Sequence, residues 1–222
     1  MSGAGIGVFG GTFDPIHVGH LRAAELVCEA LDLERMLFVP SADPPLKRGT
    51  RRVAPAQLRL EWVRLAIQDN PRFALEGLEL EREGPSYSVD TLRLLGRRLG
   101  AERLVFVIGQ DAFRELPAWR EPRILLTLAS FAVMTRPPGT GVRLEDWIPE
   151  PLVGDLELSA DGQMARHRSA RTWVRRVAIR ALDISATEIR QRLRQGRSVR
   201  YLVPEVVRRE LLAREPYRGG GD

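Results

Sequence analysis

The chain opens with a strand, a glycine-rich turn and a helix, and this arrangement constrains its fold more than any other feature. Residues 6–9 form a short apolar run that predicts a buried strand. Residues 21–31 place apolar side chains at helical spacing. Between them, Gly10 and Gly11 let the backbone approach a ligand closely, and the start of the helix directs unpaired N–H groups at an anion. The sequence therefore predicts a phosphate site in an α/β protein.

Two of the three histidines, His17 and His20, stand where this turn becomes the helix. Their spacing places both imidazoles on one face of a helical turn, where ring N–H groups can donate hydrogen bonds to phosphate oxygens. A lone histidine would be explained structurally, as a helix cap or as part of the core. The pair follows Gly-Gly-Thr and Asp-Pro directly, and that joint pattern favours a functional role.

The segment 5–10 also matches the dinucleotide fingerprint G-x-G-x-x-G. That fingerprint needs its first glycine after the strand and its third at the start of the helix. Here the glycines straddle the strand itself, and no acidic residue follows a second strand where a ribose would need one. The match is therefore rejected as an NAD(P) motif.

Strand-like and helical patterns alternate along the chain, which is typical of a doubly wound, Rossmann-like parallel sheet covered on both faces. We expect further strands at 35–40, 73–75, 104–108 and 131–134, and helices at 56–68, 89–99 and 124–128. Ligands bind such sheets at the carboxyl ends of the strands. The loop 41–47, the segment 109–111 and Arg136 are all expected at these ends and thus in one crevice.

The domain prediction is a single domain over 1–215, with a C-terminal helical segment carrying a second phosphate-binding motif. Within it, residues 137–176 show no regular pattern and are expected to form an irregular, insertion-like segment. A last strand is expected near 177–179. The glycine-rich residues 216–222 are expected to form a flexible tail.

Composition indicates a globular protein in the cytoplasm. Hydrophobic residues make up 44% of the chain and charged residues 28%, and no apolar run or signal pattern indicates a membrane partner. The single cysteine, Cys28, lies in a helical apolar pattern and is expected in the core.

The net charge of +5 is concentrated in arginines of the last quarter of the chain. Nucleic-acid binding would explain them, but the cluster has little aromatic interleaving and no nucleic-acid motif. A basic face beside a polyanionic small-molecule site explains them more simply. Lys47 is the only lysine in the chain, which points to a special role for it.

A second cluster of polar residues opens the helix after residue 184. Ser185 and Glu188 fit a capping box, which explains that pair structurally. Capping does not explain Thr187 and Arg190, whose hydroxyl and guanidinium could reach one polyphosphate together with free helix N–H groups.

Taken together, these motifs resemble those of the nucleotidyltransferases with an HxGH motif, and among them the bacterial nicotinate-nucleotide adenylyltransferases. The matching segments span most of the chain in the family's order: 10–20, 44–47, 85–91, 108–111 with Leu116 and Trp119, 136–137 and 184–190. The resemblance implies transfer of AMP from ATP to nicotinate mononucleotide, which gives deamido-NAD and pyrophosphate. One departure is Leu46, where the family usually has a histidine.

The resemblance also implies a role for each matching residue. The catalytic residues would be His17, His20 and Arg190. ATP and its phosphates would be bound by Gly10, Gly11, Thr12, Phe13, Lys47, Gly109, Asp111, Ile184, Ser185 and Thr187. Nicotinate mononucleotide would be bound by Tyr87, Ser88, Val89, Trp119 and Arg136. Mg²⁺ would be bound mainly through substrate phosphates, and no residue is named as a metal ligand.

Several alternatives stay open at this point. Phosphopantetheine or nicotinamide mononucleotide could be the acceptor, a cytidylyltransferase is less favoured, and a non-catalytic nucleotide- or RNA-binding protein is the rival from another class. Trp119 could belong to the core, and Asp111 could cap a helix instead of binding ribose. Homo-oligomer formation is left open.

Overall fold

The computed structural model describes residues 5–44, 53–135, 143–180 and 182–217. Its strands form one sheet in the order β3-β2-β1-β4-β5-β8-β7-β6. The strands are β1 (Ile6–Gly11), β2 (Arg35–Pro40), β3 (Phe73–Leu75), β4 (Leu104–Gly109), β5 (Ser130–Thr135), β6 (Leu156–Leu158), β7 (Met164–His167) and β8 (Trp173–Ala178). The expected Rossmann-like α/β fold is confirmed.

Helices and short 3-10 turns connect the strands. The α-helices are α1 (Val18–Leu31), α2 (Ala56–Ile67), α3 (Ser88–Leu99), α4 (Gln110–Arg114), α5 (Pro122–Leu128), α6 (Glu150–Val153), α7 (Ala186–Arg194) and α8 (Glu205–Arg214). The 3-10 turns are η2 (Ala101–Arg103), η3 (Leu116–Ala118) and η4 (Leu144–Asp146). Within the described ranges, no helix is both long enough and apolar enough to cross a membrane.

Contacts divide the chain into two compact units. The described residues of the first unit are 5–10, 26–36, 87–135 and 143–180, and those of the second are 11–25, 37–44, 53–86 and 182–217. The expectation of a single domain over 1–215 stays a prediction.

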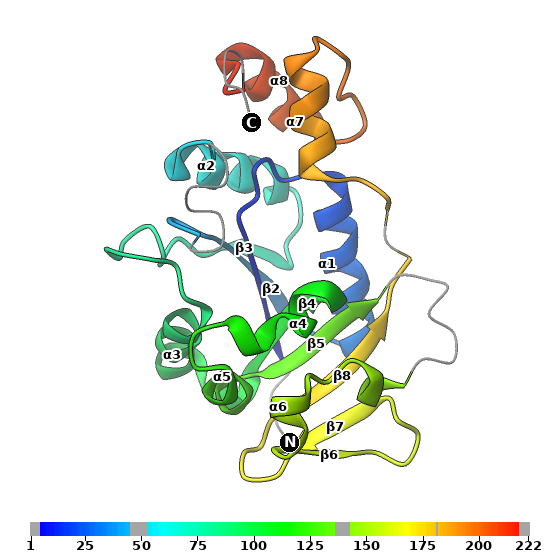
Figure 1. The fold of residues 1–222 in the computed structure, drawn as a ribbon. Coiled ribbons are helices and arrows are strands. Elements are labelled where there is room, and N and C mark those ends of the chain that lie inside the picture. The colour runs from blue at the N-terminus through cyan, green and yellow to red at the C-terminus, as the bar shows by residue number, and fades with distance from the viewer. Residues whose placement is uncertain (1–4, 45–52, 136–142, 181, 218–222) are drawn as a thin grey trace. The chain divides into compact units, whose positions relative to one another are not determined.

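The first unit is built on parallel strands with an antiparallel extension. Strands β1, β4, β5 and β8 pair in parallel, as expected, whereas β8, β7 and β6 pair antiparallel. Figure 1 shows β4, β5 and β8 side by side, with α3 and α5 packed against each other. The β4 run is apolar without a break because its side chains are buried on both faces of the sheet.

The prediction of an irregular segment over 137–176 is wrong for the described part, residues 143–176. This part holds η4, α6, β6 and β7, and β8 starts at Trp173 instead of at residue 177. The strands β6 and β7 have three and four residues, too few for a clear period. In β8, Arg175 and Arg176 interrupt the apolar pattern even though Val174 and Val177 point into the core.

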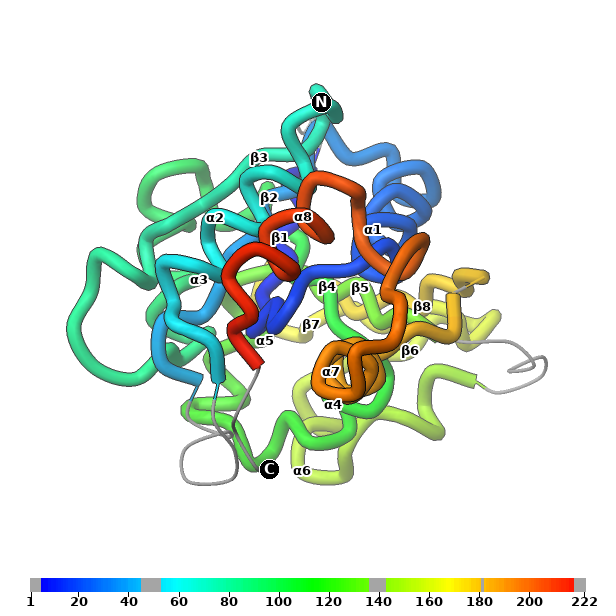
Figure 2. The backbone as a smooth tube through the Cα atoms, turned by 90° about the horizontal axis from the view of Figure 1, so that it is seen from above, coloured from blue at the N-terminus to red at the C-terminus, as the bar shows by residue number. Residues whose placement is uncertain are grey.

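The second unit contains most of the first motif and the C-terminal helices. Figure 2 shows α7, α8 and the loop between them in orange to red. Helix α8 packs on α2. The expected flexible tail is wrong at Tyr217, which is only 7% exposed. Tyr217 is held by the hydrogen bond from its own hydroxyl to Asp14. A contact made by one side chain produces no periodic pattern in the sequence. Residues 218–222 lie outside the described part of the chain.

Candidate active site

The turn after β1 exposes glycine backbone above a buried aromatic ring. Gly10 is exposed and Gly11 is half-buried, while Phe13 is 3% exposed and has a left-handed φ of 48°. A Cβ at residue 11 would approach the Phe13 ring to 2.9 Å, so only glycine fits there. The ring of Phe13 packs edge-on against His20, with centroids 5.2 Å apart. The turn therefore offers accessible main-chain atoms on a rigid support.

His17 and His20 lie side by side at the start of α1. The carbonyl of His17 accepts hydrogen bonds from the N–H groups of His20 and Leu21, so His17 stands just before the helix and His20 in its first turn. Their rings are stacked with centroids 3.6 Å apart. The backbone N–H of His17 donates to Nδ1 of His20 over 3.2 Å. In a neutral His20 ring, this acceptor role assigns the proton to Nε2.

His17 is held in its neutral form. Burial lowers the pKa of His17 to about 4, because the charged ring would lose its hydration. Its Nδ1 is buried and has no hydrogen-bond partner among the described residues. A Cβ on Gly19 would lie 2.9 Å from that atom, so the glycine of the motif makes room for the imidazole.

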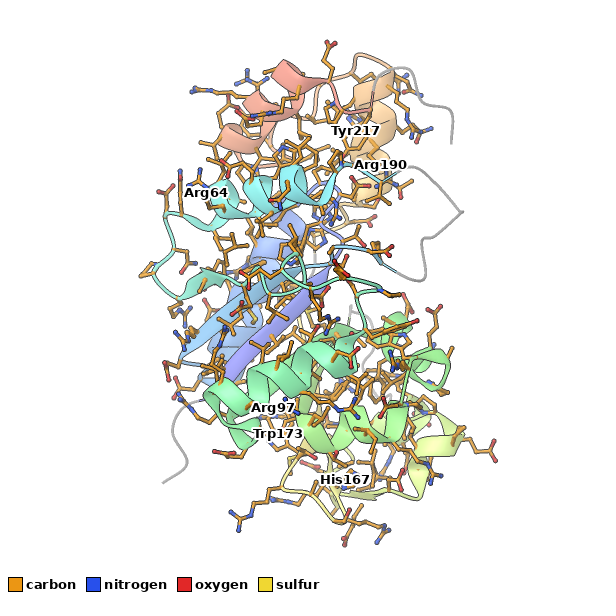
Figure 3. All side chains as sticks on the ribbon, turned by 90° about the vertical axis from the view of Figure 1, so that its left-hand side faces the viewer. Arg64, Arg97, His167, Trp173, Arg190 and Tyr217 are labelled. Carbon is orange, nitrogen blue, oxygen red and sulfur yellow. The ribbon has the colours of Figure 1, made fainter. Side chains whose placement is uncertain are left out.

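The second unit brings Arg190 to the first motif from 176 residues away in the chain. Nη1 of Arg190 donates to the backbone carbonyl of Asp14 over 2.8 Å, and Nη2 donates to Oγ1 of Thr187 over 2.9 Å. Arg190 is 5% exposed (labelled in Figure 3). The two motifs that the sequence analysis singled out thus meet through a buried guanidinium.

The start of α7 follows the predicted cap. Oγ of Ser185 accepts a hydrogen bond from the backbone N–H of Glu188 over 3.1 Å, which is one half of the capping box. Ile184, just before it, lies close to the first motif: a Cβ on Gly19 would be 3.7 Å from its Cβ. The hydroxyl of Ser185 therefore caps the N-terminus of α7.

Sequence reasoning missed Arg59, a side chain that is 1% exposed. Its guanidinium donates to the carbonyls of Thr12, Ala42 and Ala54, over 2.7, 3.2 and 2.8 Å respectively. It thus ties the glycine turn to both flanks of the segment that contains Lys47. The sequence does hold a signal for it, because Arg59 shares the apolar face of its helix with Trp62.

The residues expected to bind the pyridine ring lie in the first unit. Tyr87 occupies the N-cap position of α3 and is half-buried. The Arg120 guanidinium lies 4.8 Å from the centroid of the Tyr87 ring and 3.7 Å from Oδ2 of Asp90. Ser88 opens the helix, while the side chain of Val89 is fully buried and leaves only its backbone for a ligand.

Trp119 combines features of both interpretations left open for it. The residue is half-buried, and its ring packs edge-on against Phe106 with centroids 6.2 Å apart. Its Nε1 is buried without a hydrogen-bond partner among the described residues. Part of the indole is therefore core, and part is accessible.

Gly109 and Asp111 stand at the carboxyl end of β4, as expected. The N-cap of α4 is Gly109, and Asp111 lies exposed in the first turn of that helix. Helix capping by Asp111 is therefore wrong as an alternative, and its role toward ribose stays a prediction.

Two site predictions fall outside the described residues, those for Lys47 and Arg136. The expected meeting of the first-unit and second-unit residues in one crevice also stays a prediction. Among the described residues, no group of three or more His, Cys, Asp and Glu side chains could hold a metal ion.

A glycine turn, paired imidazoles and an arginine from the first turns of a second helix thus lie together, which is the arrangement that the resemblance to nucleotidyltransferases implies. A family model described as cytidylyltransferase-like matches residues 8–192. A Halorhodospira halophila protein named probable nicotinate-nucleotide adenylyltransferase is 44% identical over 209 residues, which cover 93% of this chain and 92% of that protein. A Thermomicrobium roseum protein of the same name is 39% identical over 96% of this chain and 91% of its own length.

Among solved structures, the chain is similar to a nicotinic acid mononucleotide adenylyltransferase of Plasmodium falciparum complexed with NaAD. The TM-score is 0.70 at 16% identity, with 96% of this chain and 97% of that chain covered, which shows the shared fold. The chain belongs to the cytidylyltransferase-like family and, within it, to the group of relatives named nicotinate-nucleotide adenylyltransferases.

Proposed function

We propose that the chain transfers AMP from ATP to nicotinate mononucleotide, giving deamido-NAD and pyrophosphate. The observation that carries the proposal is the buried hydrogen bond from Arg190 to Asp14, which joins the second motif to the turn that holds the stacked histidines. Relatives about 40% identical over nearly the whole chain bear the name of this activity. A structural neighbour is complexed with the product NaAD.

The reaction is an in-line substitution at the α-phosphorus of ATP. A 5′-phosphate oxygen of the mononucleotide forms a bond to that phosphorus, the bond to the bridging oxygen of the β-phosphate breaks, and pyrophosphate leaves with the electron pair. No covalent enzyme intermediate is required. Catalysis then consists of positioning and of stabilising the developing negative charge.

The described residues suit these tasks. His20 would donate its Nε2 proton to an α-phosphate oxygen, because its Nδ1 already accepts a backbone N–H. His17 is neutral and adds a dipole without a full charge. Arg190, with Lys47, would hold the β- and γ-phosphates, and Thr12 would orient the incoming phosphate. Magnesium would arrive with ATP as part of the substrate and neutralise phosphate charge.

Selection of the acid over the amide would depend on the region of Tyr87. N–H groups at the start of α3 can accommodate a carboxylate, and a pyridine ring can stack on Trp119 or Tyr87. Residues 85–90 contain no lysine or arginine, but Arg120 places a cation against the Tyr87 ring from elsewhere in the chain. A carboxylate there gains an attraction that a carboxamide lacks.

The test is pyrophosphate release from ATP with three acceptors: nicotinate mononucleotide, nicotinamide mononucleotide and phosphopantetheine. We expect release with the first and a kcat/KM at least about tenfold lower with the second. Release only with phosphopantetheine would replace the proposed acceptor. Failure with all three, together with salt-dependent RNA binding, would favour a binding protein instead. Cytoplasmic location and homo-oligomer formation stay predictions.

A further inference from the structure

We propose that Tyr217, which follows the last helix, is a positioning residue for adenylyl transfer. In this proposal its hydroxyl fixes the carboxylate of Asp14, and Asp14 in turn fixes the guanidinium of Arg190. The inference rests on the proposed function, because Arg190 is taken to hold the phosphates of ATP. Neither the motifs nor the family resemblance assigns Tyr217 a role.

The contact between Tyr217 and Asp14 is buried at both ends. The Tyr217 hydroxyl donates to Oδ1 of Asp14 over 2.8 Å, and the two residues are 7% and 2% exposed. The same oxygen accepts the backbone N–H of Ala54 over 3.2 Å. A charge-assisted hydrogen bond in such a setting is strong and directional. Together the two donors fix the orientation of the carboxylate.

Asp14 contacts Arg190 through two oxygen atoms and so links the orientation of its carboxylate to the position of the guanidinium. Its backbone carbonyl accepts from Nη1 of Arg190 over 2.8 Å, and its Oδ2 lies 3.9 Å from the same nitrogen. Asp14 is also only three residues before His17 in the first motif. Freeing the carboxylate would therefore loosen the arginine and the histidine turn at the same time. Figure 3 labels both Arg190 and Tyr217.

A second contact ties the C-terminal region to the first motif. The carbonyl of Leu202 accepts the backbone N–H of Val18, over 3.0 Å, at the start of α1. This N–H belongs to the first turn of a helix, where no partner exists within the helix itself. The C-terminal region thus contacts the motif on both sides of His17, at Asp14 and at Val18. Such contacts favour a role in orienting the motif.

Packing and hydrogen bonding by Tyr217 can be separated. The ring lies near Trp62, with centroids 6.2 Å apart, and contributes to the core between α2 and the C-terminal segment. Tyr217→Phe keeps the ring and removes only the hydroxyl. Trp62→Phe disturbs the same packing and leaves the hydroxyl in place. Tyr201→Phe removes a hydroxyl from a tyrosine that is 83% exposed.

The experiment measures kcat, both KM values and Tm for wild type and these three variants. We expect Tyr217→Phe to lower kcat by about 10- to 100-fold, because small misplacements of catalytic groups have effects of that size. The KM for nicotinate mononucleotide should stay within about twofold. Trp62→Phe should lower Tm with kcat nearly unchanged, and Tyr201→Phe should match wild type. A Tyr217→Phe variant with wild-type kcat, whatever its Tm, overturns the proposal.

Direct ATP binding separates this inference from the proposed function. If the wild type forms no deamido-NAD, the proposed function fails, and Tyr217 is judged by calorimetry with ATP alone. Tyr217→Phe should then weaken ATP binding about tenfold relative to Tyr201→Phe, because Arg190 is misplaced. Equal dissociation constants for these two variants would overturn the positioning role independently of the activity.

Discussion

The second unit holds the residues that we propose to bind and position phosphate, named here the phosphate region (Asp14, Arg59 and Arg190). This region and the Tyr87 region of the first unit are built in opposite ways. Around Asp14, Arg59 and Arg190 the polar groups are buried and bond mainly to backbone carbonyls. Around Tyr87 the charges are half-buried or exposed and pair with each other, as Arg93 does with Glu121 over 2.5 Å. The buried hydrogen bonds of the phosphate region fix the positions of its side chains. The ion pairs around Tyr87 determine mainly the local distribution of charge.

The difference has an energetic basis. A buried donor or acceptor that loses its partner costs about 1–3 kcal/mol, so each member of the phosphate region depends on the others. Ion pairs that water reaches contribute little to stability, so the Tyr87 region can change with little loss of stability. Chemistry shared by many nucleotidyltransferases would need the rigid region, and the choice of acceptor can be set in the tolerant one.

The largest expected effect is on turnover, at His20. His20→Ala should lower kcat by about 10²- to 10³-fold, because a donor to the developing charge is lost. Tm should change by only a few degrees. His167→Ala, in β7 of the first unit, is the control and should keep wild-type turnover. If His20→Ala lost stability in proportion to activity, the histidine would be a helix-capping residue and the contrast between the regions would weaken.

The next effect is on stability, and it compares two arginines of α2. Arg59→Met leaves three carbonyls without their donor and should lower the free energy of unfolding by about 3 kcal/mol or more. Arg64→Met removes an exposed partner of Glu61 and should change the free energy of unfolding far less, because water screens such an ion pair. Urea denaturation measures both. Equal losses would show that burial of the guanidinium does not matter here.

A pH-dependent effect of similar size follows from His17. Its pKa is about 4 in the folded state and 6.5 when unperturbed, so below about pH 6.5 the unfolded chain binds a proton that the folded chain does not. Stability should fall as the pH drops from about 6.5 to 4, by roughly 3 kcal/mol in total from this group. Unfolding free energies of wild type and His17→Gln, measured from pH 7 to 4, should converge toward acid. A constant difference between them across this range would contradict the burial argument.

The smallest expected effect is on acceptor choice. Arg120→Gln should reduce the preference for nicotinate over nicotinamide mononucleotide by about three- to tenfold in kcat/KM, with Tm unchanged. Trp119→Ala should also reduce it, because the pyridine ring loses a stacking surface. Arg97→Gln, on the exposed face of α3, is the charge-matched control and should leave the preference intact. An unchanged ratio in Arg120→Gln would assign selection to the backbone N–H groups alone.

The sequence was informative where function or burial imposes a short, local pattern. The strand β4 is apolar without interruption, and the histidine turn is contiguous, so both were predicted from neighbouring residues. The hairpin of β6 and β7 has strands too short to show a period. Tyr217 and Arg59 act through contacts with residues distant in the sequence, and Arg120 contacts a ring 33 positions before it. Of these residues, Arg59 alone shows a local signal, its place on the apolar face of its helix, and the contacts themselves are revealed only by the fold.

Gly19 has no side chain, yet a substitution there would act on its neighbour. Because any Cβ would press on the His17 ring at 2.9 Å, even alanine at this position should displace an imidazole that it does not replace. In a saturation mutagenesis screen, position 19 should therefore show the intolerance of a catalytic residue although it contributes no functional group. A redesign of the site should therefore keep this glycine together with the two histidines.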